Sequence, residues 1–156
     1  MLWLKIIVSA AIVGFCVFLG YLAAGKYRAR KKFYAQFSVF NERYLTELTY
    51  TRKPLRAFLQ EYAYTGDFKK TIVSFAERRN PELNYNYLTK EEKNECADYL
   101  AMLGKGDALS QRSYFGAQRT SLEEKRTASE KEAKSRGDLY LKLGLLAGLA
   151  FVILIL

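Results

Sequence analysis

Histidine is absent from this 156-residue chain, and cysteine is nearly absent, with Cys16 and Cys96 as the two examples. The lack of histidine removes the most common general base and the most common metal ligand. Two cysteines without a CxxC motif or a Cys/His pattern suggest neither a zinc site nor a disulfide framework. We therefore predict no metal and no cofactor, and we expect a reducing compartment around Cys96.

The sequence also lacks the common catalytic motifs. It contains no glycine-rich phosphate loop, no nucleophile elbow and no HExxH motif. Carboxylates occur in pairs, as at Glu91 and Glu92, but adjacent residues of a helix face different directions. Glu91 and Glu95 share a helical face that lysines surround, which is typical of a solvated helix start. We therefore predict that the protein is not an enzyme.

Charge is scarce at both ends of the chain and concentrated between them. The chain has 25 basic and 16 acidic residues. Two apolar runs, Ile6–Ala24 and Leu139–Leu156, are each long enough to cross the ~30 Å hydrocarbon core as a helix at ~1.5 Å per residue. Four small residues of the second run would let another helix approach closely: Gly144, Ala147, Gly148 and Ala150. We predict an N-terminal transmembrane helix in residues 1–25, one middle domain in 26–138, and a C-terminal transmembrane helix in 139–156.

Two alternatives remain open for the apolar runs. The first run is also compatible with a cleaved signal peptide, with Ala23 and Gly25 at the small-residue positions, although the basic residues after it disfavour export. The second run is also compatible with a buried core helix, although a domain of this size has little core to cover a helix that is apolar all round.

Basic residues flank both runs on the side of the middle domain: Lys26, Arg28, Arg30, Lys31, Lys32 and Arg136. Lys142 belongs to the same set, because it lies near the start of the second run and its long stem can carry the ammonium to the headgroups. The positive-inside rule therefore places the middle domain in the cytoplasm and both termini outside. We also expect these side chains to lie against anionic lipid headgroups. A nucleic-acid interface is the alternative, but no nucleic-acid-binding module accompanies the cluster, so we predict no nucleic-acid partner.

The spacing of apolar residues predicts a series of amphipathic helices in the middle domain. Pro54 suits the start of the second of these helices, because a first-turn N–H needs no partner. The turn YTGD precedes the third, with Gly66 as the stop and Asp67 as the candidate N-cap. The first helix carries a stripe at intervals of three or four residues: Phe33, Phe37, Phe40, Tyr44 and Leu48.

Capping signals mark the last two helices of the domain. Thr89 and Glu92 form a capping box for the fourth helix, and Asp107 can cap the fifth, which starts at Ala108. The second half of the fifth helix, EEKRTASEKEAKSR, must be largely solvated and runs as a stalk into the terminal apolar run. No segment alternates with period two. The sequence therefore predicts an all-α fold, an antiparallel helical bundle with an aromatic core, flanked by the two transmembrane helices.

Two stretches resemble the stage III sporulation protein AB family of endospore-forming bacteria. YLTELTYTRKPLRAFL, with Tyr50 and the Pro54–Leu55 pair, is similar to the junction between the first two helices of the family's soluble domain. YLKLGLLAGLAFVILIL, which follows a long charged helix, is similar to the family's terminal span. The resemblance implies a soluble helical bundle similar to the cytoplasmic domains of the type II secretion and type IV pilus platform proteins.

The resemblance also implies a function. We expect a membrane-anchored platform or assembly subunit of a secretion-like channel between mother cell and forespore, on the mother-cell side of the outer forespore membrane. The implied partners are the other membrane proteins of the stage III sporulation operon, a cytosolic secretion-type ATPase and membrane lipids. Charged helix faces steer such encounters. The candidate partner surfaces are the surface of the second and third helices, with Arg56, Lys69 and Lys70, and the charged stalk.

Two other classes of function remain open at this point. One is a generic two-span membrane adaptor that is not linked to sporulation. The other is an exported, membrane-tethered domain that faces outward.

Overall fold

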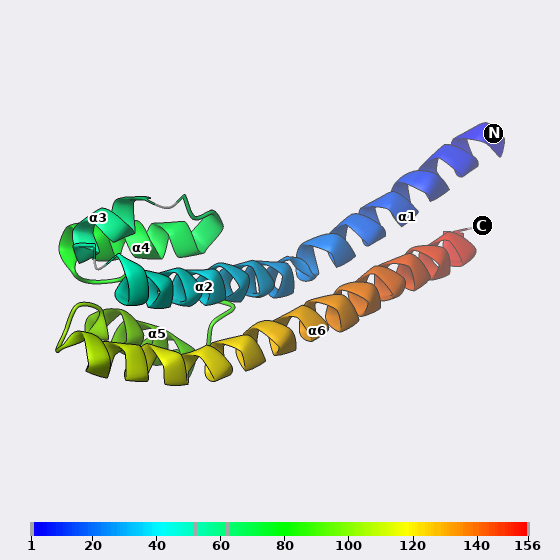
Figure 1. Cartoon of the computed structure of the whole chain (residues 1–156). Helices are drawn as coiled ribbons and strands as arrows, with labels where there is room; N and C mark the ends of the chain where they lie inside the picture. Colours follow the sequence, from blue (N-terminus) through cyan, green and yellow to red (C-terminus); the bar gives the residue numbers. More distant parts are fainter. Residues whose placement is uncertain (1, 52, 62, 156) are drawn as a thin grey trace. The chain divides into compact units, whose positions relative to one another are not determined.

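The computed structural model describes residues 2–51, 53–61 and 63–155, and these ranges contain helices and no strand. The prediction of an all-α fold is therefore confirmed. The helices are α1 (Leu2–Ala23), α2 (Gly25–Tyr50), α3 (Leu55–Glu61), α4 (Gly66–Arg78), α5 (Lys90–Met102) and α6 (Ala108–Ile155), as Figure 1 shows.

The helices contribute to two compact units. The paired-helix unit contains α1 and the part of α6 that begins at Glu130, and the bundle unit extends from Ala29 to Ser129. The bundle unit therefore holds α3, α4 and α5 together with most of α2 and the first part of α6. The predicted domain boundaries at residues 25/26 and 138/139 stay predictions.

Aromatic rings fill the core of the bundle unit. The stripe predicted on α2 is buried from Phe33 to Tyr44, and Leu48 packs against its edge. The fully buried ring of Phe40 meets the rings of Phe58 on α3 and Phe68 on α4 edge-on, at centroid distances of 5.4 and 5.7 Å. Edge-to-face packing is the favoured arrangement of aromatic pairs. Figure 1 shows α2 between the α3–α4 pair and the α5–α6 pair, so its stripe is covered from both sides.

A polar network crosses this aromatic core. The side-chain amide of Asn41 donates to the carbonyl oxygen of Phe115 at 3.2 Å, and its oxygen accepts from the hydroxyl of Tyr99 at 2.8 Å. Asn41 is 1 % exposed, so water cannot replace either partner. The network therefore ties α2 to α5 and α6 at one register.

Two of the predicted caps are confirmed. The backbone N–H of Glu92 donates to Thr89 Oγ1 at 3.2 Å, and the N–H of Thr89 donates to the Glu92 carboxylate at 3.0 Å. Both halves of the capping box are thus present at the start of α5. Asp107 caps α6, because its carbonyl oxygen accepts from Gln111 N–H at 3.0 Å and its carboxylate accepts from Leu109 N–H at 3.3 Å.

The prediction of Asp67 as an N-cap is wrong. Thr65 holds the N-cap position of α4, and the helix begins at Gly66, so that Gly66 opens this helix rather than closing the previous one. Its φ of 65° suits glycine. Asp67 lies in the first turn, where its carboxylate accepts from Lys70 at 3.0 Å and from the hydroxyl of Tyr87 at 2.8 Å. The carboxylate therefore holds the loop before α5 instead of capping the helix.

The last helix is continuous from Ala108 to Ile155, as predicted. Within the bundle unit its buried face includes Phe115, Leu122 and Ser129, which are spaced by heptads. Ser129 can be buried although it is polar, because its hydroxyl donates a hydrogen bond to the carbonyl oxygen of Arg126 at 2.8 Å and needs no water as a partner. The other residues from 123 to 136 are exposed or partly exposed, so the prediction of a largely solvated stretch is confirmed.

Candidate functional sites on the paired helices and the bundle

The two apolar helices form the first candidate site. Each is long and apolar enough to cross a membrane, and 6 % of the most apolar window of each is buried. The alternative of a buried core helix is therefore wrong for the terminal run. The two helices fit a membrane protein, since an exposed helix that is apolar all round is unfavourable in water.

Glycines let α1 and the end of α6 approach closely within the paired-helix unit. A Cβ atom added at Gly144 would lie 2.7 Å from the carbonyl oxygen of Cys16, and one added at Gly20 would lie 2.5 Å from the carbonyl oxygen of Tyr140. The atoms met are backbone atoms, which cannot rotate away. Close backbone contact through small residues is the common way for helices to pack in an apolar solvent.

A third contact sets the direction of the two helices. A Cβ atom added at Gly148 would lie 3.0 Å from Val13 Cα and 3.4 Å from Cys16 Cβ. The contacts advance along α6 from Tyr140 to Gly148 while they go back along α1 from Gly20 to Val13. The two helices are therefore antiparallel. The sequence predicted close approach at Gly144 and Gly148. The helix that approaches is α1 of the same chain, and the other two small residues, Ala147 and Ala150, are exposed.

Rings and basic side chains gather where α1 ends. The guanidinium of Arg28 donates to the carbonyl oxygen of Tyr21 at 2.6 Å and lies 3.6 Å from the centre of its ring. The ring of Tyr27 stacks on that of Tyr140 at 6.0 Å, and Lys26 Nζ lies 5.0 Å from the Tyr27 ring centre. Aromatic side chains with polar tips favour the headgroup region of bilayers, which is where the sequence predicts this segment.

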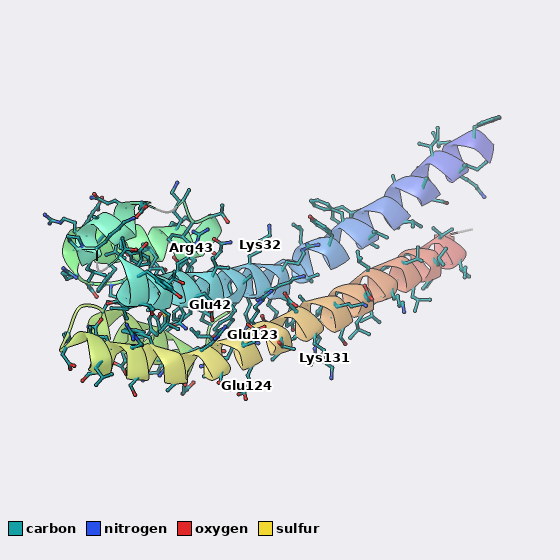
Figure 2. The ribbon with its side chains drawn as sticks, viewed as in Figure 1. Lys32, Glu42, Arg43, Glu123, Glu124 and Lys131 are labelled. Atoms are coloured by element: carbon teal, nitrogen blue, oxygen red, sulfur yellow. The ribbon has the colours of Figure 1, made fainter. Side chains whose placement is uncertain are left out.

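The remaining residues predicted to flank the membrane lie in both units. Arg136 and Lys142 of the paired-helix unit are exposed, as are Lys31 and Lys32 of the bundle unit. Figure 2 labels Lys32 on α2. Arg30 differs from these four, because its guanidinium pairs with Glu92 at 2.6 Å. These four exposed side chains are therefore accessible to a charged surface, whereas the guanidinium of Arg30 is held by an ion pair inside the bundle unit.

The Arg30–Glu92 pair joins α2 to the start of α5. One carboxylate oxygen accepts from Arg30, and the other accepts from the backbone of Thr89. Burial alone would raise the pKa of Glu92, but the hydrogen bonds from Thr89 and Arg30 outweigh it and hold this pKa below its usual value. Burial, with the nearby Glu92 carboxylate, raises the pKa of Tyr34. The sequence predicted the cap but not the ion pair, whose partners are 62 residues apart.

The predicted partner surface is exposed but does not form one cluster. Arg56 lies on α3, whereas Lys69 and Lys70 lie on α4. Lys70 donates to Asp67, and this hydrogen bond raises the pKa of Lys70. Lys69 borders a groove of about 390 Å³ between α3 and α4. The groove does not include Arg56, and its apolar lining consists of Leu59, Ala63, Tyr64, Ile72, Val73 and Ala76.

A second hollow, of about 230 Å³, lies at the end of the bundle unit where α2 connects to α3 and α5 to α6. Tyr44, Leu48 and Phe58 line one side, and Gly104 and Ala108 line the other. Sequence reasoning missed this hollow, because only the folded chain brings the two connections together.

Hydrogen bonds fix the two connections around this hollow. The buried hydroxyl of Tyr44 accepts from the backbone N–H of Gly104 at 3.2 Å and donates to the side chain of Gln111. The amide of Gln111 in turn donates to the carbonyl oxygen of Lys105 at 2.6 Å. Burial raises the pKa of Tyr44, although the bond from Gly104 opposes that shift. The hydroxyl therefore stays protonated and keeps both bonds at physiological pH.

Neither unit offers an evident catalytic cluster in its described residues. Within residues 2–51, 53–61 and 63–155, no three His, Cys, Asp or Glu side chains are grouped so that they could hold a metal ion. Burial raises the pKa of the Cys96 thiol to about 12. The thiol is therefore protonated at physiological pH and a poor nucleophile.

The chain is similar to a known protein family. The family described as stage III sporulation protein AB matches residues 74–156, which is more than half of the chain. The matched range contains α5, α6 and the end of α4, and with them the second of the two stretches that carried the resemblance. No curated protein and no solved structure gives a match.

Proposed function

This chain belongs to the stage III sporulation protein AB family, and from that membership we propose that it is a membrane-anchored platform subunit of a secretion-like channel between mother cell and forespore. The family is a sporulation family and not a known enzyme family. An adaptor unrelated to sporulation is therefore excluded. The proposed partners are the other membrane proteins of the operon, a cytosolic secretion-type ATPase and membrane lipids.

The observation that carries the proposal is the contrast between the two units. The paired-helix unit exposes apolar side chains along two helices and holds them together by backbone contact at Gly20, Gly144 and Gly148. The bundle unit has a closed aromatic core and a charged surface. Two apolar anchors joined to a water-soluble bundle are what a platform requires, since the anchors fix the bundle at a membrane and its surface is left for partners.

The proposed orientation places the bundle in the mother-cell cytoplasm and both termini across the membrane. Exposed basic side chains on the bundle side support it, among them Lys31, Lys32, Lys131 and Arg136. The same side chains would attract anionic headgroups, at about 1 kcal/mol for each cation near the surface. This orientation is the opposite of the alternative in which the bundle is exported and faces outward.

A single introduced cysteine tests the orientation. Asn86 is exposed in the loop before α5, and Asn86→Cys in a Cys16→Ser background leaves only the buried Cys96 as a competing thiol. In vegetative cells that express this variant, an impermeant maleimide is expected to label the protein only after the membrane is permeabilised. Labelling in intact cells would place the bundle outside and reject the proposal.

Binding to the ATPase tests the platform role. The full chain in detergent micelles is immobilised, and the purified ATPase of the operon is passed over it at low and at high salt. We expect binding that weakens as salt rises, because charged faces steer the encounter. Absence of binding at both salt concentrations would remove the ATPase from the proposal and leave the other membrane proteins as its partners.

A further inference from the structure

Two glycines of the paired-helix unit have no part in the close contact between its helices. Gly20, Gly144 and Gly148 each lie against backbone atoms of the other helix. A Cβ atom added at Gly25 or at Gly137, in contrast, would meet no atom of another part of the chain within 4 Å. Close approach therefore explains the first three glycines and leaves Gly25 and Gly137 without a packing role.

These two glycines lie at nearly the same level of the antiparallel pair. Gly20 lies beside Tyr140, and each step forward along α6 corresponds to a step back along α1. Gly137, three residues before Tyr140, is therefore level with Ala23. Gly25 follows within one helical turn. Both helices thus carry a glycine just beyond the end of their close contact.

The helix is interrupted at this level on the α1 side. α1 ends at Ala23 and α2 begins at Gly25, with a turn at Ala24 between them. On the other side, α6 stays helical through Gly137. Glycine weakens a helix relative to alanine, because it has more conformations to lose. Sharp bends of helices occur at such residues.

One side chain spans the interruption. The guanidinium of Arg28 reaches back seven residues and donates to the carbonyl oxygen of Tyr21 at 2.6 Å. Its central carbon lies 3.6 Å from the centre of the Tyr21 ring. Tyr21 is in the last turn of α1, where carbonyl oxygens have no partner within their own helix. Arg28 thus links the two helix ends by one hydrogen bond and one cation–π contact.

A third glycine shows that open space alone does not single out this level. An added Cβ atom at Gly14 of α1 would also meet nothing within 4 Å. The same register places Gly14 level with Leu146, so the facing helix has no glycine there. α1 is also unbroken on both sides of Gly14. Paired glycines and an interrupted helix coincide at Gly25 and not at Gly14.

We propose that Gly25 and Gly137 form a joint at which both helices change direction together, and that Arg28 holds this joint in one of its conformations. The glycine contacts between Gly20 and Gly148 keep the two helices paired as the joint bends. Such a joint lets the apolar pair adjust its tilt to the thickness of a bilayer. The inference depends on neither the channel nor the ATPase, so it can fail while the proposed function stands.

Spin labels on both sides of Gly25 test the joint in the full chain, held in nanodiscs. The labels are attached at Ala11→Cys and Lys31→Cys, which replace exposed residues. A Cys16→Ser background leaves only the buried Cys96 as a competing thiol. Pulsed electron paramagnetic resonance then measures the distribution of distances between the labels, which lie about 30 Å apart along a straight helix. We expect a main distance and a second population of bent conformers.

Three substitutions and one control then identify the joint. Gly25→Ala is expected to lower the bent population about fivefold, because alanine favours the helix. Gly137→Ala is expected to lower it as well, because α6 must bend with α1. Arg28→Gln is expected to raise it about threefold, because the link across the interruption is lost. Gly14→Ala, which adds the same methyl group between the same labels, is the matched control and should leave the distribution unchanged.

Two results would overturn the inference. A single narrow distribution in the wild type that Gly25→Ala does not change would show that the helices do not bend at this level. Equal effects of Gly14→Ala and Gly25→Ala would show that alanine stiffens the whole helix and that Gly25 has no special role. Neither result bears on the labelling of Asn86→Cys or on ATPase binding, which test the proposed function separately.

Discussion

The paired-helix unit and the bundle unit are held together in opposite ways. In the bundle unit, helices keep side chains between them, and the contacts are rings such as Phe40 against Phe58. In the paired-helix unit, side chains are largely exposed and the contacts are between backbones, as at Gly144 and Cys16. One chain thus uses large residues to pack one set of helices and the smallest residue to pack another.

The difference follows from the solvent that each unit suits. In water, burial of a ring is strongly favourable, so that large apolar side chains between helices stabilise the bundle. In hydrocarbon, lipid tails solvate an apolar side chain as well as a neighbouring helix does. Close contact of helix backbones is then the remaining source of attraction, and a side chain larger than hydrogen would prevent it. We therefore expect that a substitution can disrupt the packing of one unit and leave the packing of the other intact.

The largest effect is expected from Phe40→Ala in the bundle unit. Phe40 is 0 % exposed and packs against rings from α3, α4 and α5. Removing a buried ring typically costs about 3–5 kcal/mol. Thermal unfolding in micelles, followed by near-ultraviolet circular dichroism, should show a large fall in stability. Val39→Ala, at an exposed position of the same helix, is the control, and equal stability of the two variants would contradict the assigned core.

A smaller loss is expected from Asn41→Ala. The substitution leaves the hydroxyl of Tyr99 and the carbonyl oxygen of Phe115 without their partner inside the core. An unsatisfied buried polar group costs about 1–3 kcal/mol. Urea unfolding of the full chain in micelles measures the change. Asn86→Ala, on an exposed loop, should be neutral, and an unchanged midpoint for Asn41→Ala would show that the network does not hold α2 to α5 and α6.

Local signals in the sequence were enough for much of the bundle. The capping box of Thr89 and Glu92 was predictable because both partners lie within one helical turn. The buried stripe on α2 was predictable because helical periodicity places Phe33, Phe37 and Phe40 on one face. These features depend on neighbours in the chain, and the structure keeps them.

Features that depend on distant segments were not predictable in the same way. Asp67 fits the pattern of an N-cap, but the hydroxyl of Tyr87, 20 residues later, competes for its carboxylate. The ion pair of Arg30 with Glu92 and the 230 Å³ hollow at the end of the bundle unit likewise need tertiary packing. The small residues of the terminal run predicted a close helix contact, yet only the structure assigns it to α1 of the same chain.

Gly148→Cys tests the close contact between α1 and α6 in the paired-helix unit, because a disulfide with Cys16 would link the two helices covalently. The added Cβ atom would lie 3.4 Å from Cys16 Cβ, close to the ~3.8 Å of disulfides, once Val13 gives way by a few tenths of an ångström. Mild oxidation in micelles should therefore form a disulfide between Cys16 and the introduced cysteine, which mass spectrometry of unreduced peptides detects. Gly137→Cys, with open space around its Cβ atom, should not react with Cys16.

Two further substitutions show which unit the disulfide reports on. Gly144→Leu would collide with the backbone of Cys16, so it should lower the yield of the disulfide at least about tenfold, equivalent to about 1.4 kcal/mol. Phe40→Ala should leave the yield unchanged, since it acts on the other unit. A loss of the disulfide with Phe40→Ala would mean that the two units do not form independently.

The smallest effect is expected from Glu92→Gln, and its size depends on pH. The pKa of Glu92 lies below its usual value in the folded protein because of its hydrogen bonds to Thr89 and Arg30, despite the opposing effect of burial. A carboxyl group whose pKa is lowered by folding stabilises the fold above its unfolded pKa, about 4.3, and loses that contribution as pH falls through the folded pKa. Glutamine can still accept from the backbone of Thr89 but loses the charge, so about 1 kcal/mol should be lost at neutral pH.

Urea unfolding of the full chain in micelles at pH 7 and at about pH 3.5 separates this contribution from the rest of the acid response. The stability difference between Glu92→Gln and the wild type should be present at pH 7 and should shrink at the lower pH, where the wild-type carboxyl group begins to be protonated. Glu91→Gln is the matched control, because Glu91 is the exposed neighbour on the same helix turn. A constant difference between Glu92→Gln and the wild type at both pH values would mean that the negative charge of Glu92, and with it the ion pair with Arg30, does not stabilise the fold.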